Sequence, residues 1–127
     1  MSLPVADSEL LAVADAAAAR AYAPYSNFHV GCAVLARDGR VIEGVNVENA
    51  AYPLGVCAER TAFSRAVAEG YRPGDFAVAA ITASPCGGCR QWLYEFKIEE
   101  ITFLNSAGEL ATYSAADLLP DTWDLPA

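Results

Sequence analysis

Apolar residues recur along the chain at two spacings, and the change from one to the other marks the predicted elements. Helical spacing covers 8–23, with Asp7 as the expected N-cap and Pro24 beyond the end, and it returns over 58–69. A third helix is predicted over 87–96. Five further runs are strand-like in composition and length: 28–37, 40–47, 76–83, 101–105 and 109–114.

The connections between these five runs predict how the strands pair. Asp38-Gly39 is typical of a tight hairpin, so the first two runs should be antiparallel neighbours. A helix joins the third run to the fourth, which favours a right-handed crossover and parallel pairing. Only Ser106-Ala107-Gly108 precedes the last run, too few residues for a crossover, so that run should be antiparallel. The predicted fold class is α/β: a three-layer α/β/α sandwich with a mixed five-stranded sheet whose last strand is antiparallel, in a single domain over 1–127.

Composition limits the classes of function. The 127 residues carry a formal net charge of −8 and contain no run of Lys or Arg, which argues against nucleic acid as a partner. If glycine is counted as apolar and tyrosine is not, about 57% of the residues are apolar. Soluble domains usually contain ~45–50% on this definition, so we expect part of the apolar surface to contact a partner subunit.

The chain shows neither of the usual membrane or export signals. No apolar run approaches the ~20 residues of a membrane span. The N-terminal region, with Asp7 and Glu9, lacks the layout of a signal peptide. We therefore expect no membrane association and a cytoplasmic location.

The cysteines carry the candidate chemistry. In a reducing compartment, four cysteines favour metal binding or buried thiols over disulfides. Cys57, Cys86 and Cys89 lie at the starts of two predicted helices. A catalytic Zn²⁺ site takes three protein ligands and leaves the fourth tetrahedral position for water. Glu59 begins the same helical turn as Cys57, so it is the expected proton carrier for such a water.

Three thiolates give the zinc site a formal charge of −1, and the neighbouring residues offer ways to withdraw it. Helix N-termini favour thiolates. Arg60 and Arg90 are candidates for hydrogen bonds to the sulfurs from outside the ligand set, with a surface ion pair as the alternative for each. A second alternative is a zinc-stabilised interaction module in which Cys32 or His29 is the fourth ligand. The sequence context argues against this module, because Cys32 is expected to be a small residue of the core and His29 to have a structural role.

Three motifs in order form the pattern of zinc deaminases: N-V-E-N at 46–49, C-A-E-R at 57–60 and P-C-G-G-C at 85–89. With Y-S-N-F at 25–28 and D-L-L-P at 117–120, the chain resembles small cytidine deaminases that act on free nucleosides, over almost its whole length. The resemblance implies one Zn²⁺ per chain held by Cys57, Cys86 and Cys89, with Glu59 as the catalytic proton shuttle.

The resemblance also implies a substrate site. Asn46 and Glu48 match contacts to the ribose hydroxyls, and an amide and a carboxylate two residues apart at a strand end do face one side. Phe28 matches an aromatic wall over the nucleoside, and the Ala58 N–H matches a donor to the pyrimidine O2. The Ser84 carbonyl, held extended by the following proline, is expected to accept a hydrogen bond from the departing amine.

Oligomerisation follows from the same resemblance. Ala50, Tyr52 and Trp123 match residues that reach the site of a neighbouring subunit, which implies a homotetramer with shared sites. Two departures stand out. His29 replaces a frequent proline, and the segment 76–86 is several residues shorter than in many relatives, which bears on base preference.

The implied reaction is hydrolytic deamination of cytidine and 2′-deoxycytidine to uridine and 2′-deoxyuridine, with release of ammonia, in pyrimidine salvage. The alternative substrate is another amino-pyrimidine nucleoside such as blasticidin S, against which the pair formed by Asn46 and Glu48 argues.

Overall fold

The computed structural model describes residues 7–125, and they form one five-stranded mixed sheet. The strand order is β2-β1-β3-β4-β5. The strands are β1 (Gly31–Ala36), β2 (Val41–Val45), β3 (Phe76–Ile81), β4 (Glu100–Leu104) and β5 (Leu110–Tyr113). β3 and β4 are parallel, whereas every other neighbouring pair is antiparallel. The predicted hairpin, crossover and antiparallel last strand are therefore confirmed.

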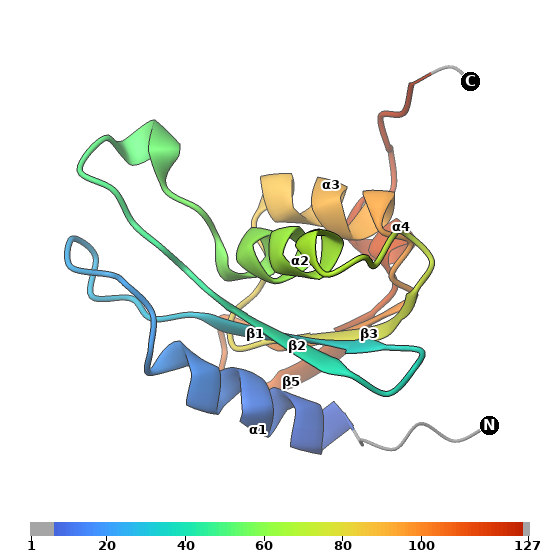
Figure 1. Cartoon of the computed structure of the whole chain (residues 1–127), viewed down its shortest axis with the longest axis horizontal. Helices are drawn as coiled ribbons and strands as arrows, with labels where there is room; N and C mark the ends of the chain where they lie inside the picture. Colours follow the sequence, from blue (N-terminus) through green and yellow to red (C-terminus); the bar gives the residue numbers. More distant parts are fainter. Residues whose placement is uncertain (1–6, 126–127) are drawn as a thin grey trace.

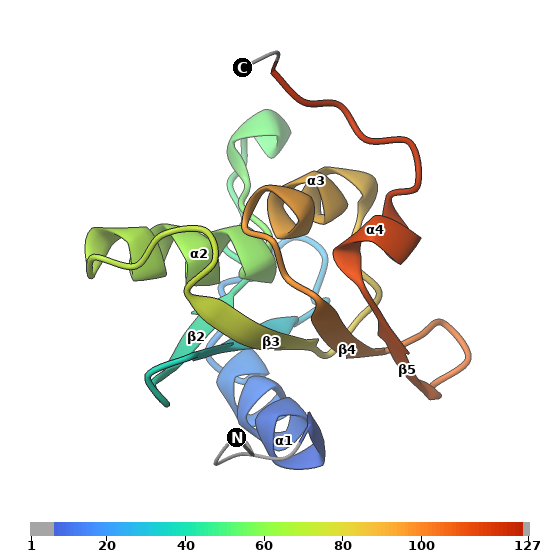
Figure 2. The same cartoon turned by 90° about the vertical axis from the view of Figure 1, so that its right-hand side faces the viewer.

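Helices cover both faces of this sheet. α1 (Asp7–Ala18) lies on one face, and α2 (Ala58–Ala68), α3 (Gly87–Glu95) and the short α4 (Ala115–Leu118) lie on the other (Figure 2). This is the predicted three-layer sandwich. Among the residues described, no helix combines the length and the apolar character that crossing a bilayer requires.

Small residues let α1 approach the sheet closely. Leu10, Ala14 and Ala17 are buried on its inner side. Gly31 of β1 faces them, and a Cβ built there would lie 1.8 Å from the Ala14 carbonyl oxygen. Only glycine fits at that point, so the backbone of β1 is in direct contact with the backbone of α1.

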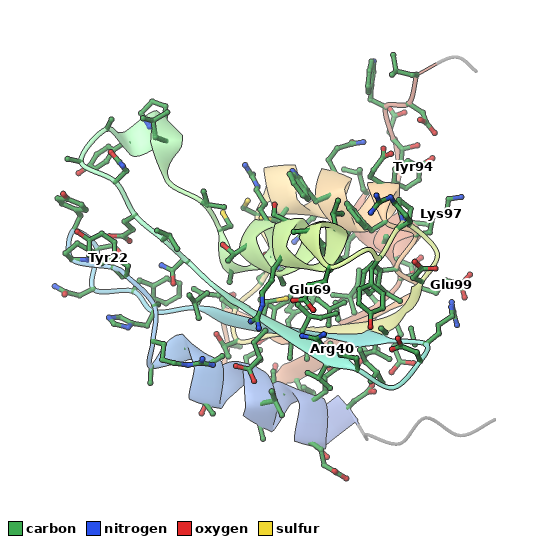
Figure 3. The ribbon with its side chains drawn as sticks, in the orientation of Figure 1. Tyr22, Arg40, Glu69, Tyr94, Lys97 and Glu99 are labelled. Atoms are coloured by element: carbon green, nitrogen blue, oxygen red, sulfur yellow. The ribbon has the colours of Figure 1, made fainter. Side chains whose placement is uncertain are left out.

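The opposite face of the sheet holds the aromatic part of the core. Phe63 of α2 stacks on Phe96 with ring centroids 4.6 Å apart and meets Phe76 of β3 edge-on at 5.6 Å. Arg40, which follows the hairpin turn, forms an ion pair with Glu69 at the end of α2 (Figure 3). β3 is buried along almost its whole length, as its continuous apolar run predicted.

The predicted bounds of α1 and the predicted start of β1 are wrong, and hydrogen bonds of the segment between them take the place of helix and strand. α1 ends at Ala18 rather than residue 23, and Asp7 lies inside the helix rather than before it. Beyond the helix, the Tyr22 N–H donates to the Asn46 carbonyl and its carbonyl accepts from the Glu48 N–H, at 3.0 and 2.8 Å. β1 begins only at Gly31, because residues 28–30 bind the side chain of Asn46.

Candidate active site

Two helix starts bring three sulfur atoms together. Cys57 is the N-cap of α2, Cys86 is the N-cap of α3, and Cys89 lies in the first turn of α3. Their Sγ atoms all lie within 4.8 Å of one another. Figure 3 shows sulfur atoms where α2 and α3 begin. Residues 29 positions apart in the sequence therefore form one cluster.

Local structure explains why the cysteines occupy these caps. Both cap residues have extended backbone, and the Cys89 N–H donates to Cys86 Sγ at 3.4 Å in the position of an N-cap hydrogen bond. The free N–H groups and the dipole at a helix N-terminus stabilise negative charge. Both helices therefore favour the thiolate form that a metal needs.

Hydrogen bonds within the cluster shift the pKa values of Cys57 and Cys89 in opposite directions. The Cys89 thiol donates to Cys57, and this bond, together with the charge of Arg60, lowers the pKa of Cys57 to about 6. The same bond and burial raise the pKa of Cys89. Arg60 Nη2 lies 3.8 Å from Cys86 Sγ, whereas its buried Nε has no hydrogen-bond partner. The guanidinium is thus held beside the sulfurs.

The donor set fits zinc. Zn–S bonds of ~2.3 Å in a tetrahedron place sulfurs roughly 3.8 Å apart, so the cluster needs to contract by about 1 Å at most. Cys32 is buried in β1 and His29 is exposed with Nδ1 3.3 Å from the Ala18 carbonyl, and neither belongs to the cluster. Their positions therefore favour the three-cysteine set over the alternative in which one of them closes the metal site, and the core position predicted for Cys32 agrees with its burial.

Glu59 is a buried carboxyl beside the sulfurs. It is the second residue of α2, only 4% exposed, and it lines the same cavity as Cys57 and Cys86. Burial is the main cause that raises its pKa above the ordinary value, and the charge of Cys57 adds to the effect. A carboxyl with a raised pKa holds a proton more readily than an exposed carboxyl, as the proton carrier of general acid–base catalysis requires.

The cavity in front of the sulfurs has a volume of about 230 Å³. Four of the predicted substrate residues line it together with Cys57, Cys86 and Glu59: Phe28, Asn46, Ala58 and Ser84. Val30, Ile81 and Ala83 supply much of the remaining wall. The cavity is therefore largely apolar, with its polar groups at the metal cluster and at Asn46.

Asn46 and Glu48 follow β2 and both bind the neighbouring segment 25–30. The Asn46 amide accepts from the Val30 N–H and donates to the Phe28 carbonyl, each at 2.9 Å. Glu48 lines an additional cavity of about 210 Å³ with Ser26 and Tyr52. Asn46 and Glu48 thus line different cavities, so their joint contact with a ribose stays a prediction, and each side chain also holds the segment that carries Phe28.

Tyr52 and Trp123 lie outside the cavity at the sulfurs. Tyr52, in the 3₁₀ helix η1 (Tyr52–Leu54), is 80% exposed, and Ala50 is also exposed. Trp123 is 67% exposed and lies along α3, where its carbonyl accepts from Gln91 at 3.1 Å. Within the described chain neither aromatic residue touches the metal cluster, so their role at a neighbouring site stays a prediction.

Arg90 has a role that the sequence did not reveal. Its guanidinium donates to the Pro85 carbonyl at 3.0 Å, the Leu118 carbonyl at 3.2 Å and Ser84 Oγ at 3.3 Å. Among residues 7–125, Arg90 makes neither the candidate hydrogen bond to a sulfur nor the alternative ion pair. Arg90 instead joins the loop before Cys86 to the end of α4, because a long forked donor can reach carbonyls that no helix satisfies. Spacing alone carries no signal for such loop contacts.

Comparisons with known proteins agree with this geometry. Residues 4–105 match the family model described as "Cytidine and deoxycytidylate deaminase zinc-binding region". The cytidine deaminase of Sporosarcina psychrophila is 42% identical over 120 residues, which cover 88% of this chain and 87% of that protein.

Solved structures give the same result. The crystal structure of cytidine deaminase from Burkholderia pseudomallei superposes with a TM-score of 0.87 at 46% identity, covering 94% of this chain and 100% of that one. The crystal structure of cytidine deaminase from Mycobacterium tuberculosis superposes with a TM-score of 0.81 at 38% identity, covering 95% of this chain and 99% of that one.

These matches, together with three cysteines clustered at two helix starts beside a buried glutamate, show a zinc-dependent hydrolytic deaminase. Within that class, the chain belongs to the cytidine and deoxycytidylate deaminase family.

Proposed function

We propose that this chain deaminates free cytidine and 2′-deoxycytidine by hydrolysis, forming uridine and 2′-deoxyuridine and releasing ammonia. The observation that carries the proposal is the placement of Cys57, Cys86 and Glu59 in one small cavity with Cys89 completing the sulfur cluster. Relatives at about 40% identity are cytidine deaminases, which supports the nucleoside over other amino compounds.

Glu59 moves the protons of the reaction. Zinc held by the three cysteines supplies a Lewis acid that makes water a nucleophile at neutral pH. Glu59 would accept one proton from the attacking water and pass it to N3 of the ring. It would then accept the second proton, from the hydroxyl now bonded to C4, and pass it to the amine, whose bond to C4 breaks. Water adds to C4 and ammonia leaves, so the carboxylate ends the cycle as it began.

The cavity walls would orient the base and the sugar. Ala58 is the first residue of α2 and lines the cavity, and its N–H, which has no partner within the helix, would donate to O2 of the pyrimidine. The Ser84 carbonyl would accept from the leaving amine, and Phe28 would cover the ring. Asn46 and Glu48 would bind the ribose hydroxyls. A nucleoside without the 3′-hydroxyl would leave these polar groups unpaired and be used poorly.

Arg60 would tune the sulfur cluster. Its Nη2 lies 3.8 Å from Cys86 Sγ. A hydrogen bond to a ligand sulfur from outside the ligand set withdraws negative charge from the metal site. The guanidinium would thus keep zinc a useful Lewis acid despite three thiolates.

A homotetramer with shared sites accounts for the exposed apolar surface. The segment 46–57 extends away from the sheet beside the segment that contains Tyr22 (Figure 1). These two segments expose several large apolar side chains: Tyr22, Tyr25, Phe28, Tyr52, Leu54 and Val56. A second copy of the chain would cover them. Light scattering should give the mass of four chains, whereas a fully active monomer would contradict shared sites.

A cytoplasmic location completes the proposal. All four cysteines are free, and thiolate ligands persist where the cell keeps thiols reduced. Fractionation of cells that produce the protein tests this location.

A substrate panel tests the proposed reaction. Purified protein is assayed with cytidine, 2′-deoxycytidine and blasticidin S, and formation of the uracil product is followed by absorbance. We expect turnover of cytidine and 2′-deoxycytidine, because Asn46 and Glu48 fit a ribose. Turnover of blasticidin S alone would contradict the proposal and support the alternative substrate.

A further inference from the structure

The carboxylate of Glu48 is held by three donors from one short turn. The N–H groups of Tyr25 and Ser26 both donate to its Oε1, at 3.0 and 3.1 Å. The hydroxyl of Ser26 donates to Oε2. These bonds lower the pKa of Glu48 below its ordinary value, the Ser26 hydroxyl most of all, so the group is an acceptor at neutral pH.

The same hydroxyl also holds the backbone of Phe28. Ser26 Oγ accepts a hydrogen bond from the Phe28 N–H at 3.0 Å. Asn27, between them, has a φ of 58°, a left-handed conformation that asparagine tolerates better than most residues. One side chain therefore connects the carboxylate of Glu48 to the residue that lines the cavity at the sulfurs.

Counting acceptor sites shows what remains for a ligand. A carboxylate offers about four acceptor sites, two on each oxygen. Two N–H groups fill those of Oε1, and the Ser26 hydroxyl takes one on Oε2. One site on Oε2 is left, and its direction is set by the bond to Ser26.

We propose that Ser26 is a positioning residue for sugar recognition: its hydroxyl orients the Glu48 carboxylate so that one acceptor site receives the 3′-hydroxyl of the nucleoside. This inference rests on the proposed function, in which Glu48 binds the ribose. Without the Ser26 hydroxyl, only Oε1 stays anchored, and the substrate itself must order Oε2. Glu59 belongs to α2 and has no contact with this turn among the hydrogen bonds of the described residues, so the proton transfers should be unaffected.

The test compares two substrates and three serine variants. Ser26→Ala should raise the KM for cytidine about tenfold, which corresponds to the lower end of the free energies measured for hydrogen bonds to charged groups. Its kcat should stay within about twofold of the wild-type value. For 3′-deoxycytidine, which lacks the hydroxyl that Glu48 would bind, kcat/KM should fall much less than for cytidine, and this smaller loss measures the part of the effect that passes through the Phe28 backbone. Ser26→Thr keeps the hydroxyl at an exposed position and should restore the KM. Ser106→Ala, in the turn before β5, is the matched control and should change nothing.

The outcomes separate this inference from the proposed function. Equal losses on both substrates would show that Ser26 only maintains the loop and would overturn the inference, as would an unchanged KM for cytidine. Turnover of 3′-deoxycytidine by Ser26→Ala at close to the wild-type rate, together with a raised KM for cytidine, shows that the variant is folded and supports the inference. If the wild type itself does not deaminate cytidine, the proposed function fails and the inference fails with it.

Discussion

Replacing Glu59 with glutamine should lower kcat for cytidine by at least ~10²–10⁴-fold while the protein keeps its zinc, because the loss of a positioned general acid–base has this magnitude. The amide has the size of the carboxyl and fits the same buried position at the start of α2, but it cannot carry a proton between water, N3 and the leaving amine. The measurement is steady-state kinetics together with the zinc content of the purified variant.

The control for this variant is Glu99→Gln, which changes an exposed glutamate before β4. It should keep wild-type kcat and one zinc per chain. Unchanged kcat in Glu59→Gln, with zinc bound, would remove Glu59 from the mechanism.

Replacing Gly44 with alanine should destabilise the protein by about 3 kcal/mol or slightly more, the upper range for forcing a methyl group into a packed core. Its Cβ would lie 2.4 Å from both the Ala58 carbonyl oxygen and the Ala62 N, and these are backbone atoms of the first turns of α2. The helix must therefore move away from β2, and Cys57 and Glu59 move with it. Compared with a typical total stability of 5–15 kcal/mol, the loss is large.

Denaturant unfolding measures this effect, and Gly55→Ala provides the control. A Cβ at Gly55 would meet its nearest atom at 3.5 Å, an ordinary contact, so this variant should unfold at the wild-type midpoint or above it. Zinc affinity and kcat should fall in Gly44→Ala only. Equal midpoints for the two glycine variants would contradict the close contact between β2 and α2.

The strand pairings were predictable because they depend on local signals. The Asp38-Gly39 turn fixed one antiparallel pair, and the length of the connection before β5 fixed another. The order of the strands, with β1 between β2 and β3, has no such signal. It depends on the antiparallel pairing of β1 with β3, two strands that are far apart in the sequence. The close contact of Gly31 with Ala14 was equally unpredictable, because the sequence does not show which backbone approaches a glycine.

The metal cluster was predictable from spacing, whereas its surroundings were not. The two helix starts that carry the cysteines meet on one face of the sheet, and Glu59, two positions after Cys57, lies in the first turn of α2. The contacts of Arg90 with carbonyl groups and the three hydrogen bonds to Glu48 involve loop residues that only the tertiary structure brings together. Sequence periodicity does not describe loops, so these contacts required the structure.

The most direct test of the zinc site is X-ray absorption at the zinc edge of the purified enzyme. We predict three sulfur neighbours and one lighter oxygen neighbour, without the scattering pattern of an imidazole. Four sulfurs, or three sulfurs with a histidine nitrogen, would contradict the catalytic interpretation, because a protein side chain would then occupy the position at which the nucleophile must bind.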